Sequence, residues 1–314
     1  MYLITGGAGF IGSNLTKKLL EDGNHVRILD DFSTGTPKNI HPLKEKYKTN
    51  LEIIEGSVCD RSTCKKALAK IKYISHHAAI PSVQQSIDHP LKTNTANVVG
   101  TLTLLEEARN VDGLEKLIFA ASSSAYGDIE SAKKIETLPP NPLSPYAAQK
   151  LLGEFYSLLY WKLFKVPTLA FRYFNIFGPN QNPDSPYSAA IPLFIRAFIQ
   201  NKRPTIFGDG NQSRDFTHID NVIDANIKGF TSKVNGEVIN IACGTQQSLN
   251  NLIDELQLIF NKKIEPIFEP SRKGDVKHSL ADISKAKKFL NYTPVTSFKE
   301  GLLKTVTAYK TVFK

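Results

Sequence analysis

Cysteine, methionine and tryptophan are scarce in this 314-residue chain, which has three, one and one of them, respectively. The three cysteines, Cys59, Cys64 and Cys243, are odd in number and widely spread, so they do not form a disulfide framework. No Cys/His spacing is typical of zinc, and a single methionine excludes a methionine-rich partner groove. We therefore expect reduced thiols in a cytoplasmic protein without a metal site.

Long apolar runs are also missing. The N-terminus has no basic segment followed by a hydrophobic stretch, and no run reaches the roughly 18 apolar residues of a membrane span. Lys and Arg outnumber Asp and Glu by 39 to 30, and this net charge of +9 indicates an acidic partner: nucleic acid, anionic lipid or a phosphorylated small molecule. The lysine pairs are scattered without interleaved aromatics, which is typical of solvated helix faces and not of a nucleic-acid groove.

The first half of the chain alternates short β-rich runs with longer helical patterns, which predicts βαβ units and a doubly wound parallel α/β sheet. Ile11, Leu15 and Leu19, for example, share one face of a helix. The expected strands are 2–5, 25–30, 51–55, 73–76, 116–121 and 167–173, and the expected helices are 11–20, 61–71, 92–109 and 146–162.

Beyond residue 175 the alternation of strand and helix patterns becomes less regular, and prolines and glycines become frequent. Helices are expected over 190–200, 220–229 and 249–260, separated by irregular segments. We predict a smaller, loop-rich lobe that carries specificity and is interleaved with the sheet domain. The expected division is 1–174 with 213–243 for the sheet domain, and 175–212 with 244–314 for the lobe.

A glycine-rich segment, Gly6-Gly7-Ala8-Gly9-Phe10-Ile11-Gly12, joins the first strand to the first helix. Gly6 permits the tight turn, Gly9 lets the backbone approach a pyrophosphate, and Gly12 allows close packing of helix and strand. The helix N-terminus, including the N–H groups of Phe10 and Ile11, then faces the phosphates. This pattern predicts a Rossmann-type dinucleotide site.

Two acidic residues, Asp30 and Asp31, end the second strand, 18 residues beyond Gly12 for the first of them. A carboxylate there accepts hydrogen bonds from the adenosine ribose hydroxyls and repels a 2′-phosphate. The expected cofactor is therefore NAD and not NADP.

Tyr146 and Lys150 are four residues apart at the start of a helix, so they share one face. A free tyrosine has a pKa near 10, and a neighbouring cation together with the positive nicotinamide ring would lower it. Ser122 lies at the carboxyl end of the strand 116–121, where ligands of such sheets bind. These three residues are the predicted catalytic group, with Tyr146 and Lys150 also contacting the cofactor.

Taken together, the glycine triplet, Ser122 before Tyr126-Gly127, and Tyr146-x-x-x-Lys150 resemble the extended short-chain dehydrogenase/reductase family, and within it the nucleotide-sugar 4-epimerases. The similarity runs through almost the whole chain. It includes the segments Asn97-Val98-Val99-Gly100-Thr101, Arg172-Tyr173-Phe174-Asn175, Gly208-Asp209-Gly210, Ser213-Arg214-Asp215-Phe216 and Arg272-x-Gly274-Asp275.

The resemblance implies roles for individual residues. Asn97 would contribute to the cofactor site. Asn175, Arg214 and Arg272 would hold the substrate diphosphate, for which the planar guanidinium is suited. Asp275 would bind the uridine ribose and Phe207 would stack on uracil. In relatives, an Asp at this position contacts adenine. This chain has Gly56-Ser57-Val58 there, so Ser57, beside Val58, would make the adenine contact.

The serine cluster distinguishes reaction types. Sister dehydratases and decarboxylases place a carboxylate just after the catalytic Ser or Thr, whereas this chain has Ser123 and Ser124. Without a base for a ring carbon, the resemblance implies C4 epimerisation of a UDP-hexose through a 4-keto intermediate. A dehydratase or a 4-ketoreductase stays a rival, and a non-catalytic NAD-sensing or nucleic-acid-binding protein is the alternative from another class.

Small residues surround the implied sugar pocket. Ser279 stands where relatives restricted to plain hexoses carry Tyr, and Ala189 and Ser82 are also small. This implies acceptance of UDP-N-acetylglucosamine and UDP-N-acetylgalactosamine. The family also implies a homodimer formed through the helices 92–109 and 146–162, with neither nucleic acid nor membrane as a partner.

Overall fold

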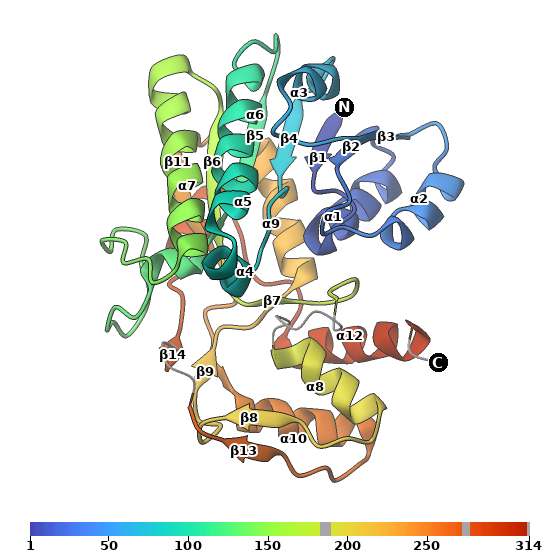
Figure 1. Cartoon of the computed structure of the whole chain (residues 1–314), viewed down its shortest axis with the longest axis vertical. Helices are drawn as coiled ribbons and strands as arrows, with labels where there is room; N and C mark the ends of the chain where they lie inside the picture. The colour runs from blue at the N-terminus through green and yellow to red at the C-terminus, as the bar shows by residue number, and fades with distance from the viewer. Residues whose placement is uncertain (183–189, 272–276, 313–314) are drawn as a thin grey trace.

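The structure is a computed structural model that describes residues 1–182, 190–271 and 277–312. Its upper layer contains a seven-stranded parallel sheet in the order β11–β6–β5–β4–β1–β2–β3 (Figure 1). The chain order reverses between β1 and β4, the switch point at which doubly wound sheets bind ligands. The predicted doubly wound α/β fold is confirmed. Its strands are β1 (Tyr2–Thr5), β2 (Val26–Asp30), β3 (Leu51–Glu55), β4 (Tyr73–His76), β5 (Lys116–Ser122), β6 (Thr168–Tyr173) and β11 (Glu237–Ile241).

Helices cover both faces of this sheet. Successive residues of a strand point to opposite faces, so Leu3 and Phe119 join the core on one face while Ile4 and Ile118 join the core on the other. This is why the strands read as continuous apolar runs. The first face carries α3 (Arg61–Leu68), α6 (Gly100–Ala108) and α7 (Pro145–Phe164); the second carries α1 (Phe10–Glu21), α2 (His41–Lys46), α9 (Ile219–Thr231) and α11 (Ser284–Leu290).

The segment predicted as one helix over 92–109 is built from three consecutive parts. A short helix α5 (Pro90–Asn94) leads into a π-helical turn, η2 (Thr95–Val99), and then into α6. Such turns are rare and often lie at functional sites. Here the turn holds Asn97 in a buried position. The helix α4 (Val83–Asp88) precedes α5, and two 3₁₀ turns are η1 (Pro37–Asn39) and η3 (Ser123–Tyr126).

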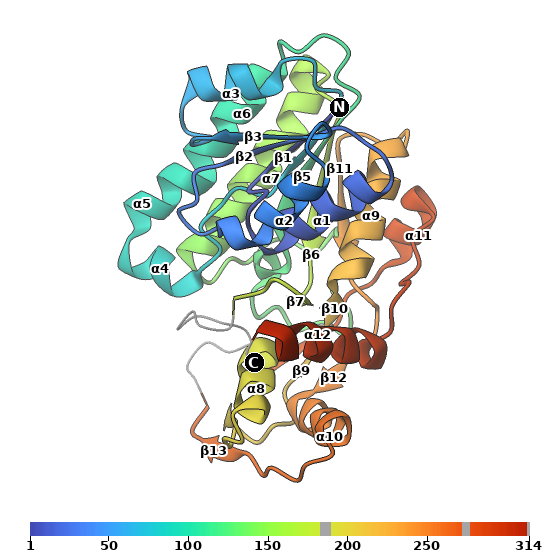
Figure 2. The same ribbon diagram turned by 90° about the vertical axis from the view of Figure 1, so that its right-hand side faces the viewer.

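The lower lobe has its own apolar core, to which Phe194, Leu252 and Leu302 belong. Its elements are α8 (Ala190–Ile199), α10 (Leu249–Phe260), α12 (Phe298–Val312), the strand pair β8 (Thr205–Phe207) and β13 (Ile267–Glu269), and the small sheet of β12 (Gln247–Ser248), β9 (Ser213–Arg214) and β14 (His278–Ser279). The pair β7 (Ile176–Phe177) and β10 (Thr217–His218) lies between the layers in Figure 2. The helix α11 packs on β11 and α9, so the chain returns to the large sheet once more.

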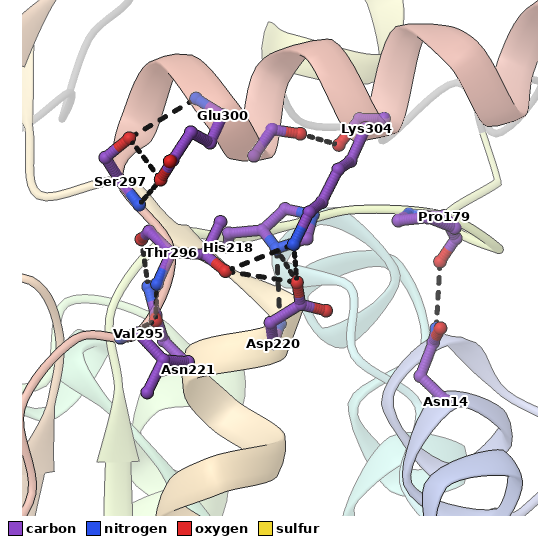
Figure 3. Close-up of polar contacts among 12 residues, drawn as sticks. Asn14, Pro179, His218, Asp220, Asn221, Val295, Thr296, Ser297, Glu300 and Lys304 are labelled. Atoms are coloured by element: carbon purple, nitrogen blue, oxygen red, sulfur yellow. Dashed lines mark hydrogen bonds and ion pairs between the residues drawn. The ribbon is translucent and has the colours of Figure 1, made fainter.

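The C-terminal helix α12 crosses between the two layers (Figure 2) and is fixed to the start of α9. Asn221 Oδ1 accepts hydrogen bonds from the N–H groups of Val295 (2.7 Å) and Thr296 (2.9 Å), and its Nδ2 donates to the Thr296 carbonyl at 2.8 Å (Figure 3). Lys304 Nζ donates to Asp220 Oδ2 at 2.7 Å. One asparagine side chain therefore satisfies three main-chain groups of the segment that leads into α12 and ties this segment to α9.

Neither a membrane-spanning helix nor a cluster of metal ligands occurs in the described ranges 1–182, 190–271 and 277–312. Within them, no helix combines the length and apolarity needed to cross a bilayer. In the same part of the chain, no three or more His, Cys, Asp or Glu side chains cluster as metal ligands would.

Candidate active site

The glycine-rich turn leaves the N-terminus of α1 accessible. Gly6 has a φ of +67°, and a Cβ there would lie 2.7 Å from the Ala78 backbone nitrogen. A Cβ on Gly12 would lie 2.2 Å from the Gly6 carbonyl oxygen, so neither position tolerates a side chain. At Gly9, by contrast, an added Cβ would meet only that oxygen, at 3.2 Å, and would fill the space in front of the helix. No side chain caps α1, so its first N–H groups, from Phe10 onward, suit a pyrophosphate.

Asp30 lies beside this turn, at the end of β2. Its Oδ2 accepts from the Ala8 N–H and its Oδ1 from the Phe32 N–H, both at 2.8 Å. Burial raises the pKa of Asp30, against the effect of these two hydrogen bonds. Asp31 is exposed, and its carboxylate is engaged with the Ser33 N–H and hydroxyl. Asp30 is therefore the acidic residue that faces the glycine turn.

The remaining predicted cofactor residues follow β3 and β4. Ser57 Oγ accepts from the Cys59 N–H at 3.2 Å, and Val58 is buried in the core below it. Asn97 uses its side-chain amide within the protein: Oδ1 accepts from the Ile80 N–H at 2.7 Å, and Nδ2 donates to the Ile80 carbonyl and to Gln149 Oε1. As it lies here, Asn97 supports the loop after β4.

Ser122 and Tyr146 meet at the carboxyl edge of the sheet. Ser122 ends β5, and its hydroxyl accepts from Ser124 through both the N–H (3.1 Å) and the Oγ (2.8 Å). Tyr146 stands in the first turn of α7 and shares a side-chain hydrogen bond with Ser122. Ser123 is half-buried in the turn η3. The predicted serine–tyrosine pair is thus brought together across 24 residues of sequence.

The pKa of Tyr146 in the protein alone is raised, whereas the sequence predicts that a neighbouring cation and the nicotinamide ring lower it. Burial raises the pKa of Tyr146 to about 12, against a smaller lowering by the hydrogen bond with Ser122. Lys150 Nζ donates to the Ala120 carbonyl at 2.9 Å, and burial lowers the pKa of this amine to about 8. The protein's own groups therefore move the tyrosine pKa upward, because loss of hydration outweighs the hydrogen bond with Ser122.

The predicted substrate residues of the described chain lie below this edge. Ser82 caps α4 by accepting from the Gln85 N–H. Phe207 ends β8 and is half-buried. Arg214 in β9 donates to the carbonyls of Ser213 (2.9 Å) and Lys277 (3.2 Å), and Ser279 in β14 pairs with it in parallel register.

Asn175 has a φ of +36° and donates from Nδ2 to the Asp215 carbonyl at 3.3 Å. It therefore lies beside Arg214, with Ser279 on the next strand. Ala189, Arg272 and Asp275 fall outside the described residues.

Three positions around the site were not predicted from the sequence. Ser86 Oγ accepts from the Tyr146 N–H at 3.0 Å, from a helix that sequence patterns did not indicate. Gln149 links Asn97 to Thr93, to which it donates at 3.0 Å. Below them, Glu154 forms a buried two-point ion pair with Arg172. Glu154 continues the Tyr146–Lys150 face at i+8, and this spacing was a usable signal.

Comparisons with known proteins agree with this arrangement. The model of the "NAD dependent epimerase/dehydratase family" matches residues 2–242. A putative UDP-glucose 4-epimerase of Methanocaldococcus jannaschii is 36% identical over 308 residues, covering 98% of this chain and 97% of the relative.

Two solved structures share the fold over nearly the whole chain. One is a UDP-N-acetylglucosamine 4-epimerase from Methanobrevibacter ruminantium in complex with UDP-N-acetylmuramic acid, with a TM-score of 0.94, 36% identity and coverage of 99% of this chain and 98% of that one. The other is a UDP-glucuronic acid 4-epimerase from Bacillus cereus in complex with UDP-glucuronic acid and NAD, with a TM-score of 0.90, 37% identity and 99% coverage of both chains.

Proposed function

The chain belongs to the NAD dependent epimerase/dehydratase family and is an NAD-using enzyme of the epimerase class, and from this premise we propose that it interconverts the C4 epimers of UDP-hexoses. The observation that carries the proposal is the Ser122–Tyr146 pair at the carboxyl edge of the parallel sheet, the same edge at which the uncapped helix α1 follows β1. Bound NAD supplies the two-electron acceptor and donor for C4, together with the positive charge of its nicotinamide ring. Gly9, Asp30 and the first turn of α1 suit its pyrophosphate and adenosine ribose.

The chain's own side chains move the proton. Tyr146 removes the proton of the C4 hydroxyl and later returns it, and Ser122 donates or accepts the hydrogen bond that holds this hydroxyl. Because burial keeps the pKa of Tyr146 at about 12 in the protein alone, the phenolate depends on the cofactor's positive charge. Lys150, whose amine stays largely protonated at neutral pH with a pKa of about 8, binds the nicotinamide ribose.

The UDP group holds the substrate while the sugar turns. Asn175 and Arg214, joined by Arg272 and Asp275, bind the diphosphate and uridine, and Phe207 stacks on uracil. The 4-keto hexose then rotates about its diphosphate linkage and presents its other face. Most of the binding free energy therefore comes from UDP, and the hexose itself is held loosely.

Product analysis tests the proposal. Purified enzyme is incubated with UDP-glucose, UDP-galactose and their 2-acetamido counterparts, and the nucleotide sugars are separated by chromatography. The expected result is an equilibrium mixture of C4 epimers reached from either side. A stable keto sugar would instead indicate a dehydratase, which Ser123 and Ser124 oppose because neither offers a carboxylate base. Stoichiometric consumption of NADH would indicate a ketoreductase.

Acceptance of 2-acetamido sugars rests on Ser279, which is half-buried in β14 beside Arg214. Replacing it by tyrosine is expected to lower kcat/KM for UDP-N-acetylglucosamine by about 10- to 100-fold, because a pocket mismatch costs about 1–3 kcal/mol. The value for UDP-glucose should change little. Steady-state kinetics of Ser279→Tyr with both sugars measures this, with Ser279→Ala as the small-residue control; equal losses on both sugars would contradict the gatekeeper role.

A second copy of the chain is the proposed partner of the helices α5, η2 and α7. An exposed apolar stripe runs along α7 and faces solvent beside further apolar side chains of the neighbouring segment: Leu152, Phe155, Leu159, Leu163, Leu91 and Val99, each at least 43% exposed. The spacing on α7 keeps these side chains on one helix face, as in a helical bundle between subunits. A contiguous patch of this kind marks an interaction surface.

Charge on this stripe is expected to separate the subunits. Leu159→Lys should convert the dimer to a monomer, since each subunit would have to bury an unpaired ammonium in the apolar interface. Light scattering after size-exclusion chromatography measures the mass. Leu303→Lys on α12, which is 54% exposed on a different surface, serves as the control. An unchanged mass for Leu159→Lys would contradict the proposed interface.

A further inference from the structure

Asp215 lies among the proposed substrate residues Asn175, Arg214 and Ser279, but its carboxylate is fully buried. It follows Arg214 directly at the end of β9, and its relative exposure is 0%. The segment Ser213-Arg214-Asp215-Phe216 belongs to the motifs seen in the sequence, in which only the arginine has received a role. A buried carboxylate in such a place needs compensation for its lost hydration.

Main-chain N–H groups from two distant segments provide that compensation. Oδ1 accepts from the Cys243 N–H at 2.9 Å, and Oδ2 accepts from the N–H groups of Gly244 (2.9 Å) and Ala281 (3.3 Å). Cys243 and Gly244 lie in the loop between β11 and β12, and Ala281 follows β14. Since β12 and β14 flank β9 in the small sheet, the carboxylate ties both neighbouring strands to the central one.

The main chain of Asp215 adds two more ties to predicted substrate residues. Its N–H donates to the Ser279 carbonyl at 2.8 Å. Its carbonyl accepts from Asn175 Nδ2 at 3.3 Å. Asn175, Arg214 and Ser279 therefore converge on a single residue, although they are up to 104 positions apart in the sequence.

The carboxylate acts as an ion in this position. Burial raises the pKa of Asp215 to about 6, and its hydrogen bonds from the backbone pull in the opposite direction. The group is therefore mostly ionised at neutral pH, when both oxygens accept hydrogen bonds. An asparagine has the same shape but turns one acceptor into a donor, which would face N–H groups.

We propose that Asp215 is a positioning residue for nucleotide binding, which holds Asn175, Arg214 and Ser279 in one arrangement through main-chain hydrogen bonds on both sides of β9. This inference rests on the proposed function, in which those three residues contact the UDP-sugar. Asp215 itself touches neither substrate nor cofactor. Its loss should lower the affinity for UDP and leave the proton transfer by Ser122 and Tyr146 unchanged.

The test uses Asp215→Asn in the NAD-containing enzyme, with UDP as the probe. The Kd of UDP from calorimetry is expected to rise at least tenfold, and the KM of the UDP-sugar should rise in parallel. The kcat at saturation should stay within about threefold of wild type, and the NAD content should not change. A Kd within twofold of wild type in a folded variant would overturn the proposal.

Two further variants separate the possible failures. Asp282→Asn is the matched control, because this nearby carboxylate accepts from the Ser284 N–H and lies outside the Asp215 cluster; its Kd for UDP should not change. Arg214→Ala should weaken UDP binding if the proposed function is right. Weak binding by Arg214→Ala with normal binding by Asp215→Asn would overturn only the positioning role, whereas normal binding by Arg214→Ala would contradict the substrate site itself.

If Asp215→Asn does not fold, a measurement on the wild-type enzyme tests the positioning role of Asp215. Hydrogen–deuterium exchange is followed in the holoenzyme with and without UDP. If the carboxylate couples the segments, UDP should slow exchange at Cys243, Gly244 and Ala281 together with 213–215. Slower exchange at 213–215 alone would overturn the proposal.

Discussion

Replacing Tyr146 by phenylalanine should reduce the epimerisation kcat by about 1,000-fold, within the range that positioned general acid–base groups contribute. The phenol oxygen is the atom that would exchange the C4 proton, and phenylalanine keeps the ring that fills this half-buried position. Binding of UDP should persist, because the proposed diphosphate contacts come from other residues, Asn175 and Arg214. Initial rates with UDP-galactose at saturation measure the effect.

The control for this experiment is Tyr156→Phe, which removes a phenol from the same helix, α7, ten residues further on. That variant should keep wild-type turnover. NAD content, measured by absorbance after denaturation, should match the wild type for both variants. Turnover near the wild-type value in Tyr146→Phe would rule out Tyr146 as the proton-transfer group.

Replacing Glu154 by alanine should lower the free energy of unfolding by about 3–5 kcal/mol, the usual cost of leaving a buried charge without its partner. Arg172 donates from Nε to Glu154 Oε2 at 2.8 Å and from a terminal nitrogen to Oε1 at 2.6 Å. The two side chains are only 4% and 2% exposed. The pair joins α7, which carries Tyr146, to β6, so its loss disturbs the packing of the helix that holds the proposed catalytic tyrosine.

Urea-induced unfolding followed by circular dichroism measures this loss. The control is Glu21→Ala, which removes one partner of the exposed pair with Lys17, whose side chains are 42% and 59% exposed. This variant should unfold almost as the wild type does, because exposed pairs contribute little. A loss below about 1 kcal/mol for Glu154→Ala would mean that Arg172 finds another acceptor or reaches water.

Features that depend on local spacing could be predicted from the sequence. The position of Gly6, Gly9 and Gly12 between a strand and a helix indicates a phosphate-binding turn, and the structure confirms the doubly wound sheet to which that turn belongs. The i, i+4 spacing of Tyr146 and Lys150 fixes a shared helix face. The strand that ends at Ser122 leads to the same edge of the sheet. The roles of these residues stay predictions that the variants above test.

Features that depend on contacts between distant segments could not be predicted. Nothing in the pattern around Ser86 indicates that it accepts the Tyr146 N–H. The π-helical turn at Asn97 is not distinguishable from an ordinary helix by periodicity. The upward shift of the Tyr146 pKa depends on how completely the ring is buried, which the spacing to Lys150 does not determine.

The sequence by itself therefore determined six strands of the sheet, the glycine turn and the edge at which the proposed reactive residues stand, because strand and helix periodicities are local properties of the chain. The seventh strand, β11 (Glu237–Ile241), was not predicted. Tertiary structure alone decided which polar groups lose water and which partners replace it. The buried carboxylates of Glu154 and Asp215 illustrate this: the first is matched by Arg172 from β6, and the second by main-chain N–H groups at Cys243, Gly244 and Ala281. Only the folded chain brings those donors to them.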